Sequence, residues 1–226
     1  MLDYRVISIG TLSNHPLWNE PAGASLRTPH ATTTLVRSGG KALLVDPALP
    51  GPALAARLHE RSGLRPAEVT DIFLTHFRPA HRGGLSLFEH ARWWIPQPER
   101  EAVGHHLLGQ LDRAEDEQTR QVLKQEVTLL RRCQPAPDKL LPGVDLFPLP
   151  GYTPGLCGIL LSFPSATVLI ASDAVATVEH LERGQVLEGS YDASQALESF
   201  REAVEIADWI IPGHDNIVPN MARRTF

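Results

Sequence analysis

Cysteine is scarce in this chain of 226 residues, which has two, Cys133 and Cys157, at distant positions. Two separated thiols provide neither the disulfide framework of a small secreted domain nor a Cys-x-x-Cys metal site. Long apolar runs are also missing, because none approaches the roughly 18 residues that cross a bilayer. We therefore expect a cytoplasmic protein that has no membrane partner.

Excess positive charge is absent as well. The chain has 21 Lys and Arg against 26 Asp and Glu, which gives a formal net charge of −5 at pH 7. Proteins that bind nucleic acid neutralise its phosphates with clustered basic side chains. The acidic balance therefore argues against nucleic acid as a partner.

Apolar residues are plentiful, at 42% of the chain, and suffice for a sizeable core. No linker rich in proline, glycine and serine divides the sequence, so we expect a single domain over residues 1–226.

Strand and helix signals alternate along most of the chain. Residues 32–36 and 41–45 flank a Ser-Gly-Gly turn and predict a β-hairpin. A proline in the first turn and a glycine cap predict a helix over residues 51–63. Further strands are expected within residues 4–12, 69–76, 91–96, 144–149, 157–163, 166–174 and 208–214. A further helix is expected within residues 191–207. Strands that lead into both hairpins and helices predict a layered α/β or α+β architecture.

Residues 97–132 differ from this pattern, because they have helical periodicity and almost no strand signal. We expect two helices there, with a break near residues 114–116.

Four of the predicted strands run into turns that carry polar residues. These segments read FLTHFRPAH, PLPGYTPG, LIASDAV and WIIPGHDN. A layered fold gathers strand ends at one edge, where loops build sites. We therefore expect convergence of His76, His81, Asp173 and His214, with Arg78 and Tyr152 beside them. Imidazoles and a carboxylate are ligands that zinc, iron or manganese accept.

The order of these motifs resembles that of the metallo-β-lactamase superfamily. The family pattern is His-x-His-x-Asp-His after a strand, then Pro-Gly-His-Thr-Pro-Gly, then an Asp at a strand end, then a late Pro-x-His. The resemblance extends from the hairpin at residues 32–47 to the segment at residues 210–216. It implies a four-layer αββα sandwich, here with a helical insert at about residues 97–132, and a hydrolase site that usually holds two metals.

This chain departs from the family pattern at three ligand positions. Arg78 replaces the middle His of the first motif, Ala80 replaces its Asp, and Tyr152 replaces the His of the second motif. One implied metal position then keeps only His76, and we judge it lost.

The other implied metal position keeps His81, Asp173 and His214. Two histidines and a carboxylate suffice for one zinc or iron(II) ion with open positions. The resemblance thus implies one divalent metal or none. The plain alternative is an inherited polar cluster in which His76 and its neighbours only support the fold.

Arg78, Tyr152 and Asp173 are the candidate catalytic residues. Arg78 could project into the lost metal position and pair with Asp173, or it could bind a substrate carboxylate or phosphate. Tyr152 could hydrogen-bond the same group or stabilise an oxyanion. The alternatives are a solvent-exposed arginine and a packing tyrosine.

Two functions are compatible with these changes. The first is a metal-dependent hydrolase of a small-molecule ester, lactone, thioester or amide, with a degraded and mononuclear site. The second is a metal-free, non-catalytic member that binds a small anionic ligand or a partner. For the insert, the resemblance implies either a cover over the cleft or a homodimer interface, and we expect partial cover.

Overall fold

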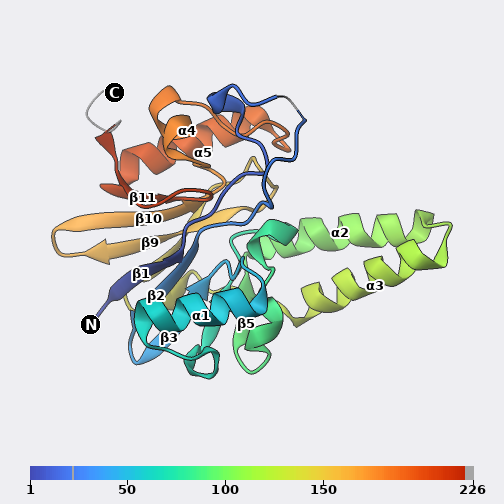
Figure 1. Cartoon of the computed structure of the whole chain (residues 1–226), viewed down its shortest axis with the longest axis horizontal. Coiled ribbons are helices and arrows are strands. Elements are labelled where there is room, and N and C mark those ends of the chain that lie inside the picture. The colour runs from blue at the N-terminus through green and yellow to red at the C-terminus, as the bar shows by residue number, and fades with distance from the viewer. Residues whose placement is uncertain (22, 222–226) are drawn as a thin grey trace.

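The computed structural model describes residues 1–21 and 23–221. Within them, two six-stranded sheets pack against each other, with helices on their outer faces (Figure 1). This is the four-layer αββα sandwich that the sequence predicts. Among the described residues, no helix is both long enough and apolar enough to cross a membrane.

The first sheet contains the N-terminal strands in sequence order. They are β1 (Asp3–Ser8), β2 (Thr33–Ser38), β3 (Lys41–Val45), β4 (Asp71–Phe73), β5 (Arg92–Ile95) and β6 (Gln134–Pro135). The predicted hairpin joins β2 to β3 through Gly39 and Gly40, whose φ angles of 59° and 75° require residues without a side chain. Strand β4 is shorter than predicted, because the chain leaves the sheet at Leu74 and turns into the loop that carries His76.

The second sheet has the order β12-β11-β10-β9-β8-β7. Its strands are β7 (Lys139–Leu141), β8 (Val144–Pro148), β9 (Cys157–Phe163), β10 (Ala166–Ser172), β11 (Trp209–Pro212) and β12 (Val218–Pro219). Strands β10 and β11 run parallel, so their carboxyl ends lie side by side at one edge.

Alternation along the strands separates the layers. In β3, Leu43 and Val45 face the second sheet, while Leu44 packs under helix α1 (Gly51–Ser62). In β10, Val168 and Ile170 face the first sheet, while Leu169 packs against helix α5 (Ala193–Ile206). Both helices match the sequence prediction. The short helix α4 (Val178–Arg183) was not predicted.

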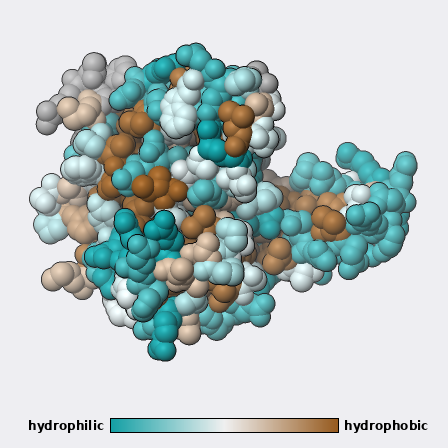
Figure 2. All heavy atoms as spheres, in the orientation of Figure 1, coloured by the Kyte–Doolittle hydropathy of each residue, from teal (hydrophilic) through white to brown (hydrophobic). Residues whose placement is uncertain are grey.

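The predicted helical insert is an antiparallel pair, α2 (Gln97–Arg113) and α3 (Glu117–Arg132). It projects from the sandwich as an arm (Figures 1 and 2). Leu107, Leu123 and Leu130 are buried and continue the core beneath α1. Leu108 and Val122 are 49% and 53% exposed, so the arm also carries apolar surface that nothing in the described chain covers.

Candidate metal centre

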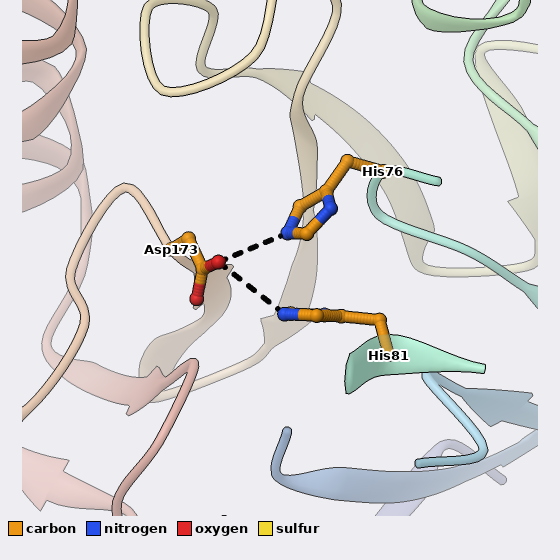
Figure 3. Close-up of side chains that lie close together, drawn as sticks. All are labelled: His76, His81 and Asp173. Atoms are coloured by element: carbon orange, nitrogen blue, oxygen red, sulfur yellow. Dashed lines mark hydrogen bonds and ion pairs between the residues drawn. The ribbon is translucent and has the colours of Figure 1, made fainter. Parts of the chain in front are cut away.

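The strand ends bring the predicted residues together. His76 follows β4, Asp173 follows β10 and His214 follows β11, while His81 ends a short 3-10 turn, Pro79–His81. All four are buried. Figure 3 shows His76 and His81 both pointing at the carboxylate of Asp173.

Asp173 is the hub of the cluster. Its Oδ2 lies 3.1 Å from His76 Nε2 and 3.3 Å from His81 Nε2. Its Oδ1 lies 3.1 Å from His214 Nε2. Three imidazoles therefore converge on one carboxylate.

The orientation of His81 is set from behind by Asp46. His81 Nδ1 donates to Asp46 Oδ2 at 2.9 Å, and Asp46 also accepts hydrogen bonds from the backbone N–H and the hydroxyl of Thr75. With its proton on Nδ1, neutral His81 presents a bare Nε2 to Asp173. A carboxylate behind a ligating histidine is the usual support of a metal site.

His214 has the same arrangement with different partners. Its Nδ1 lies 3.1 Å from the carbonyl oxygen of Thr11 and 2.9 Å from that of His30. Carbonyl oxygens only accept hydrogen bonds, so this nitrogen carries the proton. The ring therefore turns its Nε2 toward Asp173, 3.1 Å from Oδ1.

His76 is oriented in the opposite way. The backbone N–H of Arg78 donates to His76 Nδ1 at 3.2 Å, which places the proton of the neutral ring on Nε2. That proton is donated to Asp173 Oδ2. His76 thus holds the carboxylate by a hydrogen bond, and it would have to give up the Arg78 contact to act as a ligand through Nε2.

The charges in the cluster shift three pKa values. Burial alone would lower the pKa of His81, but the carboxylates of Asp173 and Asp46 raise it to about 10. Burial alone would raise the pKa of Asp173, but His81 and His214 hold it well below its usual range. Burial, and then the charge of His81, lower the pKa of His76, which keeps that ring neutral.

Two atoms of the cluster are available as donors to a divalent ion. His81 Nε2 and Asp173 Oδ1 are buried and satisfy no hydrogen bond, although each faces the cluster. Donor atoms around a tetrahedral zinc lie roughly 3.3 Å apart, given bonds of about 2.0 Å. The contacts of 3.1 and 3.3 Å are close to that spacing.

One donor set has the spacing of a shared ion. Among the described residues, one group of three offers ligand atoms all within 4.8 Å of one another: His76, His81 and Asp173. The set implied by the family pattern takes His214 instead of His76, and among the described residues its ligand atoms are not all within that distance. His214 Nε2 faces Asp173 Oδ1, whereas His76 Nε2 donates its proton to Asp173 Oδ2.

Backbone strain supports the position of the carboxylates. Asp46 and Ser172 have φ angles of 48° and 51°, in the left-handed region that non-glycine residues rarely adopt. Ser172 directly precedes Asp173. A Cβ at Gly213 would lie 2.3 Å from Asp173 Oδ1, so only glycine leaves room for the carboxylate there.

The predicted ion pair between Arg78 and Asp173 is wrong. The Arg78 guanidinium donates to the Tyr152 hydroxyl at 2.7 Å and stacks on its ring, 4.0 Å from the centroid. Among the described residues, the ion-pair partners of Asp173 are His76, His81 and His214. Arg78 is exposed because the loop after His76 directs its side chain outward over Tyr152.

Tyr152 separates the cluster from a cavity. Its ring meets His76 edge-on, with centroids 5.7 Å apart, and burial raises the pKa of its hydroxyl. On the other side lies a cavity of about 710 Å³ that Arg78 and Tyr152 help to line. Helix α2 and Glu126 of α3 form another wall, so the base of the arm covers this region while its tip projects away.

Sequence reasoning missed Glu99, the buried acid that joins the two site loops. Its carboxylate accepts the backbone N–H groups of Phe77 and Gly155, each at 3.1 Å. It also missed a second buried group, in which His15 and His180 both contact the Thr177 hydroxyl. Glu99 and its partners, like His15 and Thr177, are far apart in sequence, so no local signal marks these contacts.

Comparison with known proteins agrees with the geometry. A model of the metallo-beta-lactamase superfamily matches residues 27–214. The chain therefore belongs to the metallo-β-lactamase superfamily, a family of metal-binding hydrolases. No curated protein matches the sequence.

Solved structures with this fold share little sequence with the chain. A probable metal-dependent hydrolase from Staphylococcus aureus is 15% identical, with a TM-score of 0.72 and coverage of 97% of this chain and 91% of that one. AiiA from B. thuringiensis, solved with N-decanoyl-L-homoserine at its active site, is 22% identical, with a TM-score of 0.63 and coverage of 95% and 92%.

AidC, a dizinc quorum-quenching lactonase, is 20% identical, with a TM-score of 0.63 and coverage of 81% of this chain and 72% of that one. At these identities the likeness shows the fold alone.

Proposed function

We propose that this protein is a hydrolase with one divalent metal at His81, Asp173 and His214, acting on an ester, lactone, thioester or amide of a small molecule. The observation that carries the proposal is the orientation of His81 and His214, whose Nε2 atoms both face Asp173. Each ring has its Nδ1 proton taken by an acceptor outside the cluster, and each faces the same carboxylate. This is the orientation that metal ligands need.

The residues of the chain have distinct parts in this reaction. When bound, the ion supplies Lewis-acid polarisation and a water of lowered pKa. Asp46 holds His81, and His76 holds Asp173 through its Nε2–H. Tyr152, neutral because burial raises its pKa, offers a hydroxyl proton to an oxygen that gains negative charge.

Two relatives in fold support the reaction class without defining the substrate. AidC is described as a lactonase, and AiiA was solved with an N-acyl homoserine at its active site. Lactone opening needs the same polarised carbonyl and activated water as ester hydrolysis. We keep zinc and iron as the candidate ions, because histidine and carboxylate ligands suit both.

A hydrolysis panel tests the proposal. Metal-loaded protein is assayed with one aryl ester, one lactone, one thioester and one anilide, beside His214→Ala and the control His59→Ala, an exposed residue of helix α1. We expect turnover of at least one substrate, a loss of about 100-fold or more in His214→Ala, and an unchanged rate in His59→Ala. Equal rates in all three proteins would show that the activity does not use this site.

The second candidate is a metal-free protein that binds a small anionic ligand. The mutual contacts of Asp173 with three imidazoles favour it, because the cluster is held together without an ion. A protein that takes up no metal and hydrolyses none of the panel would favour this candidate, or the binding of a partner, over the hydrolase.

A further inference from the structure

We propose that the cavity between the arm and the site loops binds a small amphipathic monocarboxylate, with its carboxylate on Arg78 and its apolar body against helix α2. The inference rests on the proposed function only for the hydrolysis of the bound ligand at the adjacent metal centre. The binding itself follows from the charge, the lining and one unsatisfied hydroxyl of this cavity.

The cavity has the size of a small-molecule site. Its volume of about 710 Å³ lies within the roughly 300–1,000 Å³ of ligand pockets. The walls come from segments far apart in the sequence: the loop after β4, both arm helices, the loop around Tyr152, and Tyr191 at the mouth. The backbone N–H of Tyr191 donates to the Tyr152 carbonyl and ties this last segment to the wall.

The charged side chains that line the cavity differ in whether they have partners. Glu99 is buried and its two oxygens accept backbone N–H groups, while Glu126 is paired with Arg82. Arg78 has no carboxylate within ion-pair distance in the described chain, and its hydrogen bond goes to the neutral Tyr152 hydroxyl. Arg78 is therefore a permanent positive charge of the lining that no carboxylate of the described chain pairs with.

One such charge suits a monoanion. The Tyr152 ring covers one face of the guanidinium and leaves its other N–H groups available, and a planar fork of donors matches a carboxylate in two parallel hydrogen bonds. A phosphate monoester carries nearly two charges at neutral pH and would leave one of them unmatched. The geometry thus favours a carboxylate.

The rest of the lining combines an apolar wall with one free hydroxyl. Phe77, Ala102, Val103 and Pro154 supply the apolar surface. Thr153 also lines the cavity, is 6% exposed, and its Oγ1 satisfies no hydrogen bond. A buried hydroxyl without a partner costs stability, and a hydrogen bond with a bound ligand would remove that cost.

Binding is measured with 4-phenylbutanoate as the probe, in chelator-treated protein, by calorimetry and ligand-observed NMR. Arg78→Gln removes the charge and keeps the length, and Arg113→Gln on the same arm is its control, since Arg113 lies outside the cavity. Val103→Phe fills the cavity, and Val122→Phe adds the same bulk to an exposed position of the arm. Thermal melts establish that each variant is folded. If Val103→Phe does not fold, the comparison of Arg78→Gln with Arg113→Gln decides the test.

We expect Arg78→Gln to weaken binding about tenfold or more and Arg113→Gln less than twofold, as the loss of a charge-assisted hydrogen bond requires. Val103→Phe should abolish binding and Val122→Phe should not. The neutral amide of the probe should bind at least tenfold more weakly. An unchanged affinity in Arg78→Gln, equal binding of the amide, or tighter Arg78-dependent binding of phenyl phosphate would each overturn the inference.

The outcome is separable from that of the proposed function. The probe cannot be hydrolysed, and its binding is measured without metal. A protein that proves inactive as a hydrolase can therefore still bind the probe as predicted. If the protein is a hydrolase but its cavity does not bind the probe, the inferred substrate class is wrong and the proposed function stands.

Discussion

At the residue scale, the site is defined as much by Ala80 as by the histidines that remain. Ala80 stands where the family pattern has an aspartate, in the 3-10 turn directly before His81. The structure offers no other carboxylate in place of that side chain within the turn. The missing group would serve both as a ligand and as the acceptor that orients water.

Restoring this carboxylate should therefore strengthen the site. In Ala80→Asp we expect metal affinity to rise about tenfold or more, in line with the effects of single supporting groups at metal sites, and any hydrolysis rate to rise with it. Competition with a chromogenic chelator measures the affinity. The isosteric control Ala80→Asn lacks the charge, and an equal gain in that variant, or no gain in Ala80→Asp, counts against a metal centre at His81.

The raised pKa of His81 predicts how the stability of the metal-free protein depends on pH. Its folded value of about 10 lies above the ordinary 6.5, so protonated His81 stabilises the fold fully below pH 6.5. That contribution is lost as the pH rises through about 10. Melting curves of chelator-treated protein from pH 6 to pH 10 should show the loss.

The matched variants are His81→Gln and His105→Gln. The first should flatten the decline in melting temperature over this range, and the second, on the exposed arm, should leave it unchanged. Identical pH profiles for wild type and His81→Gln would show that the imidazole is not held between two carboxylates.

At the scale of elements, Glu99 connects the arm to the site. It lies in the first turn of α2 and accepts one N–H from the loop of His76 and one from the loop of Tyr152. A Cβ at Gly155 would lie 2.0 Å from the Glu99 backbone nitrogen, so these segments cross in close contact. The three elements are therefore positioned together.

Removing this carboxylate should loosen both loops. We expect Glu99→Ala to lower the free energy of unfolding by about 2–4 kcal/mol, because two buried N–H groups lose their acceptor. The exposed Glu101→Ala on the same helix should change it by less than about 0.5 kcal/mol. Urea denaturation measures both, and equal losses would exclude a specific role for Glu99.

Local patterns predicted the elements better than the contacts between them. The Ser38-Gly39-Gly40 turn and the alternation of buried residues in β3 and β10 depend on residues that are neighbours in the sequence. The structure confirms both. The link from Glu99 to Gly155 joins residues 56 apart. A periodic pattern in the sequence cannot predict such a long-range contact. The same is true of the contact between His15 and Thr177.

At the scale of the whole molecule, the order of motifs predicted the αββα sandwich, and the family match confirms it. The direction of the Arg78 side chain was not predictable. The motif places Arg78 near the cluster, but it does not determine whether the guanidinium points toward Asp173 or stacks on Tyr152. Homodimer formation through the arm stays a prediction, for which Leu108 and Val122 are the exposed apolar residues.

The central claim is a site for one metal at His81, Asp173 and His214, and metal content tests it most directly. Protein purified without a polyhistidine tag is assayed for zinc, iron, manganese and nickel by plasma mass spectrometry, beside the double variant His81→Ala/His214→Ala. We predict about one ion per wild-type chain and none in the variant, as a set of two histidines and one carboxylate requires. No metal in the wild type, even after incubation with excess zinc or iron(II), would contradict the account.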